Sequence, residues 1–147
     1  MSTHRLHMEL FVGVMLLVVA PLLSAQTTAD LRNKFGPPDE HGYYIVRKGV
    51  RLKVSTEKEK VREMVIQPDD VKSQVSYSSF IPAPTINEII AELAPVSLRG
   101  KHIRSIVFNA GLSSIAAEDY EKVTIGISST ERGGTVGITS AGIRWKQ

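Results

Sequence analysis

The spacing of apolar residues predicts one helix and three strands in the first half of the chain. Leu31 and Phe35 lie four residues apart, which places them on one face of a helix that Thr27 or Thr28 can cap. Gly36 and the two prolines that follow it end this helix. Apolar and polar residues then alternate, as they do in strands. The predicted strands cover residues 43–47, 50–54 and 61–67.

Two further helices are expected in the second half. Residues 85–88, Thr-Ile-Asn-Glu, have the pattern of a capping box, which opens a helix that Pro95 stops. A second helix is predicted over residues 103–110, because apolar residues recur there at i, i+3, i+4 and i+7 and Gly111 follows as a helix terminator. These apolar residues are Ile103, Ile106, Val107 and Ala110.

The last third of the chain is predicted to form a β-hairpin. Residues 123–128 and 136–145 alternate between apolar and polar positions, and the turn at residues 131–134 joins them. Runs of strands separated by helices are typical of an antiparallel sheet with helices packed against it. We therefore predict an α+β domain, in which an antiparallel sheet of about five strands carries two or three helices on one face.

The N-terminal segment has the pattern of a secretory signal. Arg5 precedes an apolar run at residues 10–23, and Ala25 offers the small residue at which a signal peptidase cuts. The run is shorter than the roughly 20 residues that a membrane-spanning helix needs. We predict a signal peptide over residues 1–25 and a single domain over residues 26–147, exported to the periplasm or secreted. Retention of the segment as a membrane anchor is the alternative.

Composition narrows the classes of function. The chain has 18 lysines and arginines against 15 aspartates and glutamates, a net charge of +3, and this mild excess is not the clustered charge of a nucleic-acid-binding protein. The absence of cysteine excludes thiol catalysis, cysteine-bound zinc and disulfide bonds. We expect a protein or an anionic component of the envelope as partner, no nucleic acid and no cofactor.

A local motif suggests a family. Residues 35–38 read Phe-Gly-Pro-Pro, at the corner between the predicted helix and the first predicted strand. A short helix, this corner and a three-stranded meander resemble small exported bacterial domains of the outer-membrane assembly lipoprotein and β-lactamase-inhibitor-like type, over residues 31–67. The resemblance implies a non-catalytic binding domain in the cell envelope. The chain departs from the lipoproteins because it has no cysteine to acylate.

Residues that could carry out chemistry are few. Residues 39–41, Asp-Glu-His, are adjacent, so their side chains diverge, and a metal or acid–base site there would need His102, Glu118 or Asp119 from the second half. No motif of nucleophilic catalysis or of phosphate binding occurs in a matching context. We predict a solvated turn and no catalytic or metal site. The enzymatic alternative is a small hydrolase or metal-dependent enzyme that uses His41 or His102 with nearby carboxylates.

Two segments carry residues suited to contact a partner. One is a basic hairpin, in which Arg51 and Lys53 share one side of a strand and could bind an anionic surface. The other is the connection at residues 71–84, whose aromatic residues could anchor a partner. The candidate binding residues are Arg47, Lys48, Arg51, Lys53, Tyr77 and Phe80. The leading prediction is an exported, non-enzymatic binding domain; a membrane-tethered structural subunit is a further alternative.

Overall fold

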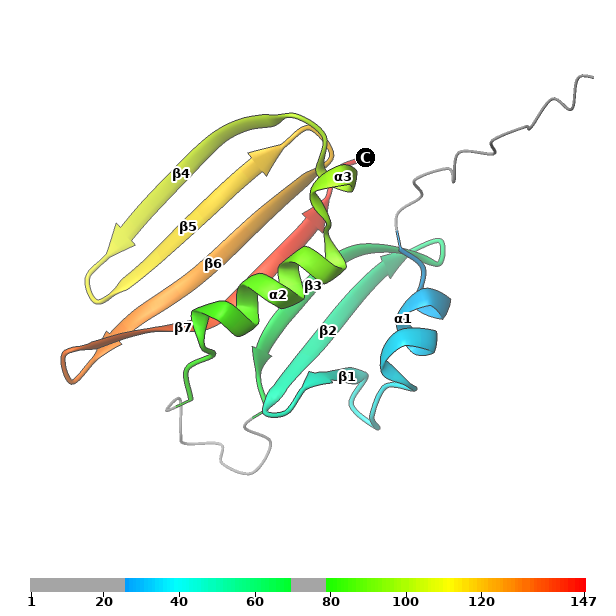
Figure 1. The fold of residues 1–147 in the computed structure, drawn as a ribbon, viewed down its shortest axis with the longest axis horizontal. Coiled ribbons are helices and arrows are strands. Elements are labelled where there is room, and N and C mark those ends of the chain that lie inside the picture. Colours follow the sequence, from blue (N-terminus) through cyan, green and yellow to red (C-terminus); the bar gives the residue numbers. More distant parts are fainter. Residues whose placement is uncertain (1–25, 70–78) are drawn as a thin grey trace, which may run out of the picture.

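A single antiparallel sheet organises the chain (Figure 1). The structure is a computed structural model and describes residues 26–69 and 79–147, so the predicted signal peptide and Tyr77 lie outside the described residues. The described helices and strands, in chain order, are α1 (Thr28–Phe35), β1 (Tyr43–Arg47), β2 (Val50–Glu57), β3 (Lys60–Pro68), α2 (Ala83–Leu93), α3 (Val96–Arg99), β4 (His102–Ala110), β5 (Ser113–Tyr120), β6 (Val123–Arg132) and β7 (Thr135–Trp145).

The sheet consists of two meanders joined along one seam. Its seven strands follow the order β1-β2-β3-β7-β6-β5-β4, and every neighbouring pair is antiparallel. The last strand, β7, pairs with β3. The chain therefore leaves the first meander after β3 and comes back beside it only with its final strand. The connection that contains α2 and α3 therefore crosses the sheet, and β1 and β4 become the two edges (Figure 1).

Local capping explains α1 and the turn that follows it. Thr27 and Asp30 form a reciprocal capping box, in which Thr27 Oγ1 accepts from the Asp30 backbone at 3.2 Å and Asp30 Oδ2 accepts from the Thr27 backbone at 2.8 Å. Gly36 ends the helix at φ 82°, a conformation that favours glycine. Asp39 Oδ1 then accepts from the backbone N–H groups of His41 and Tyr43 at 2.9 and 2.8 Å. The acidic run after the helix is thus a turn, as predicted.

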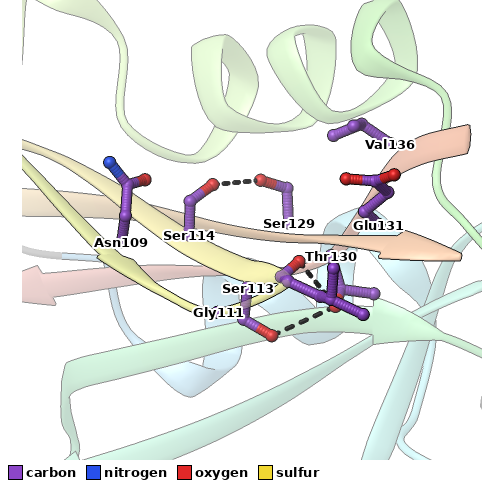
Figure 2. A pocket seen from close by; sticks show the side chains of 9 residues that line it. Asn109, Gly111, Ser113, Ser114, Ser129, Thr130, Glu131 and Val136 are labelled. Carbon is purple, nitrogen blue, oxygen red and sulfur yellow. Dashed lines mark hydrogen bonds between the residues drawn. The ribbon is translucent and has the colours of Figure 1, made fainter. Parts of the chain in front are cut away.

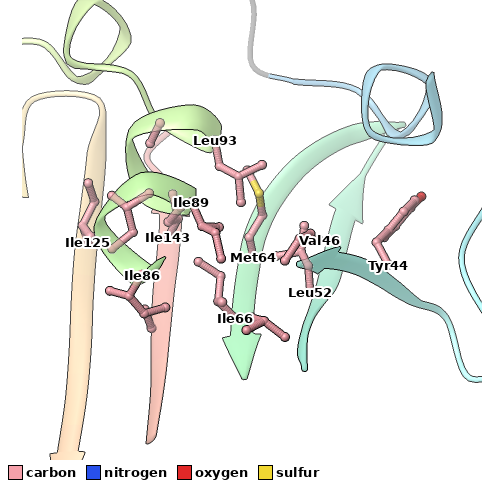
Figure 3. Packing of buried hydrophobic residues seen from close by; sticks show 14 of the residues in the cluster. Tyr44, Val46, Leu52, Met64, Ile66, Ile86, Ile89, Leu93, Ile125 and Ile143 are labelled. Atoms are coloured by element: carbon pink, nitrogen blue, oxygen red, sulfur yellow. The ribbon is translucent and has the colours of Figure 1, made fainter. Parts of the chain in front are cut away.

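The core lies between α2 and the centre of the sheet. Ile86, Ile89, Ile90 and Leu93 form the buried face of α2. They belong to the same buried cluster as Met64, Ile66, Ile125 and Ile143 of the strands beneath (Figure 3). Leu31 of α1 is also part of this cluster. Each such side chain contributes about 1.5–3 kcal/mol when it is removed from water. We call the face that carries these buried residues the helix face, and the opposite face the outer face.

Several predicted elements are confirmed, but the capping box at residues 85–88 is wrong. The predicted helix at residues 28–35 and the three strands that follow it appear as α1 and β1 to β3, and the terminal hairpin appears as β6 and β7. Helix α2 begins earlier than expected, with Pro82 as its N-cap residue and no capping hydrogen bond from a side chain. Its proline in the first turn starts the helix instead, because it needs no backbone partner there.

The fold-class prediction is also wrong. The described residues are mostly β, with 55% in strands and 20% in helices, and they form one seven-stranded antiparallel sheet rather than a five-stranded sheet with helices packed on one face. The predicted helix at residues 103–110 is strand β4, and β5 was not expected at all. Both strands lie beyond the part of the sheet that the helices cover, so no buried face imposed a period-2 pattern on them.

No helix in the described part of the chain is both long and apolar enough to cross a membrane.

A partly exposed ion-pair network connects helices α1 and α2 to the edge strand β1. Glu92 of α2 accepts from Arg47 of β1 at 2.6 Å and from Lys34 of α1 at 2.9 Å. Burial raises the pKa of the Glu92 carboxyl, but the hydrogen bonds from Lys34 and Arg47 outweigh that effect and hold the pKa below its ordinary value. The ionised form of Glu92 is therefore the form that the folded state favours.

Acid should weaken this network. Because the pKa of Glu92 is lowered on folding, its contribution is fully present above about pH 4.5, the ordinary value for glutamate, and is lost as the pH falls through the folded-state pKa. Glu92→Gln should lower the free energy of unfolding by about 1 kcal/mol at pH 7 and make the loss below pH 4.5 shallower. Urea unfolding at several pH values measures both effects. Glu88→Gln, at an exposed position of the same helix, should change neither.

Candidate functional site

Strand β4 is an unprotected sheet edge. All nine of its residues are exposed, and among the strands of residues 26–69 and 79–147 it pairs only with β5. Four of them are large hydrophobic residues, among which Val107 is 67% and Phe108 62% exposed. The other edge is different, because β1 has only five residues, Tyr44 and Val46 are buried, and α1 contacts it. Exposed hydrophobic residues on a long edge strand are the feature that most native sheets avoid.

Two glycines set the limits of this strand. Gly100 lies before β4 at φ 76°, and Gly111 follows it at φ 59°. Ala110 pairs with Ser113, so Gly111 and Leu112 form a two-residue hairpin loop. A positive φ at the first loop residue only is typical of a type II′ turn, whose twist matches that of the strands it joins.

The hairpin determines which backbone groups of β4 are free. The pair that closes a two-residue hairpin is a hydrogen-bonded pair, and such pairs alternate with non-hydrogen-bonded pairs along the ladder. Counting back along the strand from Ala110, every second residue directs its N–H and C=O groups to β5. These residues are Phe108, Ile106 and Arg104. The backbone groups of the alternate residues therefore face the open edge. These residues are Ser105, Val107 and Asn109.

The two faces of this edge differ in character. On the outer face, Ile106 and Phe108 of β4 lie beside Ala117 and Ile115 of β5, and form an apolar surface that none of the described helices covers. We call Ile106, Phe108 and Ile115 the outer apolar patch. On the helix face, Ser105, Val107 and Asn109 lie beside Glu118, Ala116 and Ser114. Serine, asparagine and glutamate side chains flank Val107 and Ala116 on this face, and the buried residues of α2 pack over the centre of the sheet instead.

Three polar side chains meet near the start of β4, but their geometry is not that of a catalytic triad. Ser105 Oγ and His102 Nε2 both approach Glu118 Oε2, at 2.6 and 2.7 Å, and lie 3.3 Å from each other. In a triad, one ring nitrogen faces the serine and the other faces the acid. Here one nitrogen faces both groups. Hydrogen bonds from Ser105 and then His102 lower the pKa of the Glu118 carboxyl, so the cluster is a surface polar contact.

A site that would combine His41 with His102 is ruled out by distance. His41 precedes β1 and His102 begins β4, at opposite edges of the sheet. Six strand spacings of about 4.8 Å separate these edges by roughly 29 Å. His41 has only Glu40 beside it, at 3.5 Å, and both side chains are exposed. Among residues 26–69 and 79–147, no group of three or more histidines and carboxylates is placed to hold a metal ion.

A shallow pocket lies at the tip of the sheet (Figure 2). Its volume is about 180 Å³, below the roughly 300 Å³ at which small-molecule sites begin. The hydroxyl groups in it bond to one another, with Ser114 and Ser129 at 2.7 Å and Ser113 and Thr130 at 3.1 Å. These hydroxyl contacts hold β5 to β6.

The structure separates the four predicted basic residues. Arg47 bonds to Glu92 and serves the fold, and Lys48 lies in the exposed β1–β2 turn. Arg51 and Lys53 lie on the outer face over the Tyr43 ring, at 4.2 and 5.0 Å from its centroid. Their binding of an anionic partner stays a prediction.

The predicted aromatic contacts are only partly described. Tyr77 lies outside the described residues. Phe80 is half-buried and packs on Gly137 of β7, where a methyl group would overlap its ring, and Ile81 beside it forms a β-bridge with Ile138. Arg132 lies 5.6 Å from the ring centroid of Phe80. Phe80 therefore holds the connection against the sheet.

Sequence reasoning missed the exposed edge. The signals that favour a strand at residues 102–110 were the β-branched and aromatic residues, which prefer strands, and the glycines at both ends. The i, i+3, i+4, i+7 spacing outweighed them, although no serine, threonine, aspartate or asparagine precedes residue 103 as an N-cap.

Comparisons with known proteins give one distant similarity. No family model and no curated protein matches the sequence. The chain is similar to the crystal structure of an extracellular protein containing a SCP domain from Bacillus anthracis str. Ames, with a TM-score of 0.35 and 12% sequence identity over 98% of this chain and 50% of that protein. The chain thus spans about half the length of that protein. A similarity this distant defines neither a shared fold nor a shared function.

The contact between Phe80 and Gly137 can be tested by adding one methyl group. Gly137→Ala should displace the Phe80 ring and lower the free energy of unfolding by about 1–3 kcal/mol, the usual cost of overpacking. Gly126→Ala is the matched control, because open space surrounds that position on β6, and it should change stability by less than about 0.5 kcal/mol. Equal stability of the two variants would contradict the packing of Phe80 on β7.

Proposed function

We propose that this chain is an exported, non-enzymatic interaction domain that binds a partner protein by adding an extended segment of that partner to β4. The observation that carries the proposal is the nine-residue edge, exposed along its whole length and free of proline and lysine. Native sheets protect such edges with short strands, proline, lysine or a covering element. The bulge between His102 and Arg104 and the charge of Arg104 lie at the start of β4, and the edge from Ser105 to Ala110 carries no protecting device, which suits it to strand addition.

The chemistry of the edge defines the segment that fits it. Three residues of β4 direct their backbone groups outward, so an added strand can form about six main-chain hydrogen bonds. At about 1 kcal/mol each, these bonds do not outweigh an association cost of about 4–15 kcal/mol. Side chains of the partner must therefore also bury the outer apolar patch. The fitting segment has apolar residues at alternate positions on that side.

Several observations support export and a binding role. The apolar run at residues 10–23 and the small residue at Ala25 support export. The resemblance of residues 31–67 to binding domains of the bacterial envelope supports a non-catalytic role there. The separation of His41 from His102, and the single ring nitrogen that serves both Ser105 and Glu118, weigh against the enzymatic alternative.

The proposal predicts that proline at the centre of β4 blocks binding. Val107→Pro removes an N–H group that faces the open edge and leaves the ladder to β5 intact, because prolines are tolerated on edge strands in that orientation. A photo-crosslinking residue placed at Asn109 of the full chain, in the cell that exports it, reports contacts along the edge. We expect crosslinked products with the otherwise unchanged chain and at least a tenfold loss with Val107→Pro.

Two controls make this result specific. Val107→Thr keeps the branched side chain and the N–H group and should keep the crosslinks, and the same crosslinking residue at Lys48, on the far side of the sheet, should give none of these products. Thermal unfolding of each variant shows whether it folds. Crosslinks at Asn109 that survive Val107→Pro in a folded protein would rule out strand addition.

A further inference from the structure

We propose that the strand received by β4 is the β4 of a second copy of this chain, so that two chains form a symmetric dimer with one continuous sheet. This inference rests on the proposed function of β4 as a site of strand addition. Two identical edge strands related by a twofold axis perpendicular to the plane of the sheet pair antiparallel and keep the same faces together. If residue i of the first copy lies opposite residue j of the second copy, then residue j of the first copy lies opposite residue i of the second. The strand must therefore be complementary to its own reverse.

The backbone of β4 meets this condition in one register. In the regular ladder from Arg104 to Ala110, Ser105, Val107 and Asn109 direct their backbone groups outward, and they are spaced symmetrically about Val107. With the twofold axis at Val107, Val107 pairs with Val107 of the second copy and Ser105 pairs with Asn109 of the second copy. Every outward N–H and C=O group of the three residues then has a partner. A shift of the register by two residues leaves one of the three residues on each copy unpaired.

The side chains agree with the same register. On the outer face, Ile106 lies opposite Phe108 of the second copy, and Phe108 opposite Ile106, so the two outer apolar patches become one. Phe108 also lies beside Ile115 of its own chain, which extends the joined surface on both sides. On the helix face, Val107 meets itself, and the Ser105 hydroxyl lies opposite the Asn109 amide, a pair able to hydrogen-bond.

Charge favours the antiparallel pairing as well. Arg104 is the charged residue of β4 and lies near its start, and the end of the strand and its turn carry no charge. The twofold register places Arg104 opposite Ala110 of the second copy, and the two Arg104 residues lie about 20 Å apart along the strands. Arg104 already pairs with Asp119 of its own chain at 3.4 Å, and His102 pairs with Glu118 at 2.7 Å. Pairing therefore brings no unmatched charges together.

Space allows the second copy to approach. No described helix or strand lies beyond β4, which forms the rim of the sheet in Figure 1. The pairing would also remove the exposed edge altogether and leave β1, the short strand next to α1, at both ends of the joined sheet.

Disulfide trapping tests the register directly. The chain has no cysteine, so Ile106→Cys and Phe108→Cys each introduce a single thiol. These positions face each other across the twofold axis as a non-hydrogen-bonded pair, the geometry in which cross-strand Cβ atoms are closest. Under mild oxidation, a mixture of the two full-chain variants should form a disulfide-linked dimer, and each variant alone should form at least tenfold less. Equal linkage in all three samples, or none in the mixture, would overturn the register.

Sedimentation equilibrium of the unchanged chain tests the dimer itself. We expect a mass twice that of one chain, a shift to the monomer with Val107→Pro, and a retained dimer with Val107→Thr. A monomer at every concentration, or a dimer that persists in a folded Val107→Pro variant, would overturn the inference. The dimer can fail while the proposed function holds. Crosslinks from Asn109 to a different protein, abolished by Val107→Pro, would uphold strand addition to β4 and exclude a second copy as the added strand.

Discussion

The pairing of β3 with β7 is the interaction on which the rest of the structure depends. It joins a meander from the first half of the chain to a meander from the second half. Met64 and Ile66 of β3 pair directly with Ile143 and Ala141 of β7, and all four are buried. Helix α2 belongs to the same buried cluster and packs over them (Figure 3). The core forms where the two halves meet, because only there does the sheet offer an apolar surface wide enough for a helix.

The same arrangement leaves β4 uncovered. With the core at the seam and the helices above it, β4 and β5 extend away from it and are held by their ladder to β6 and by hydroxyl contacts such as Ser114 with Ser129. Their faces carry no buried residue, yet β4 retains isoleucine, valine and phenylalanine. A strand that contributes nothing to the core and still exposes such side chains is better explained by a contact outside the chain than by the stability of the fold. The exposure of apolar residues on β4 and the proposed pairing of this edge thus both follow from the strand order, which places β4 at the rim of the sheet.

How far the sequence predicted this structure depends on burial. The elements next to the core were predictable: α1 with its cap at Thr27, the strands β1 to β3 and the terminal hairpin, because one buried face imposes a periodic pattern on each. The turn at Asp39 was predictable from local chemistry. The exposed edge was not, because a strand with both faces in water has no reason to alternate. Its apolar residues then matched a helical spacing by chance, and the candidate site followed the visible charges at Arg51 and Lys53 instead.

The sequence by itself determined the local elements around the core, the absence of thiol chemistry and an N-terminal segment with the pattern of an export signal. Those properties depend on composition, on caps and turns and on the period of burial, all of which are local. Only the tertiary structure decided that β7 returns to β3, that Arg47 serves the fold through Glu92, and that β4 is an edge. These depend on which segments meet across the sheet, and strand order is set by the joint burial of residues far apart in the chain rather than by any one segment.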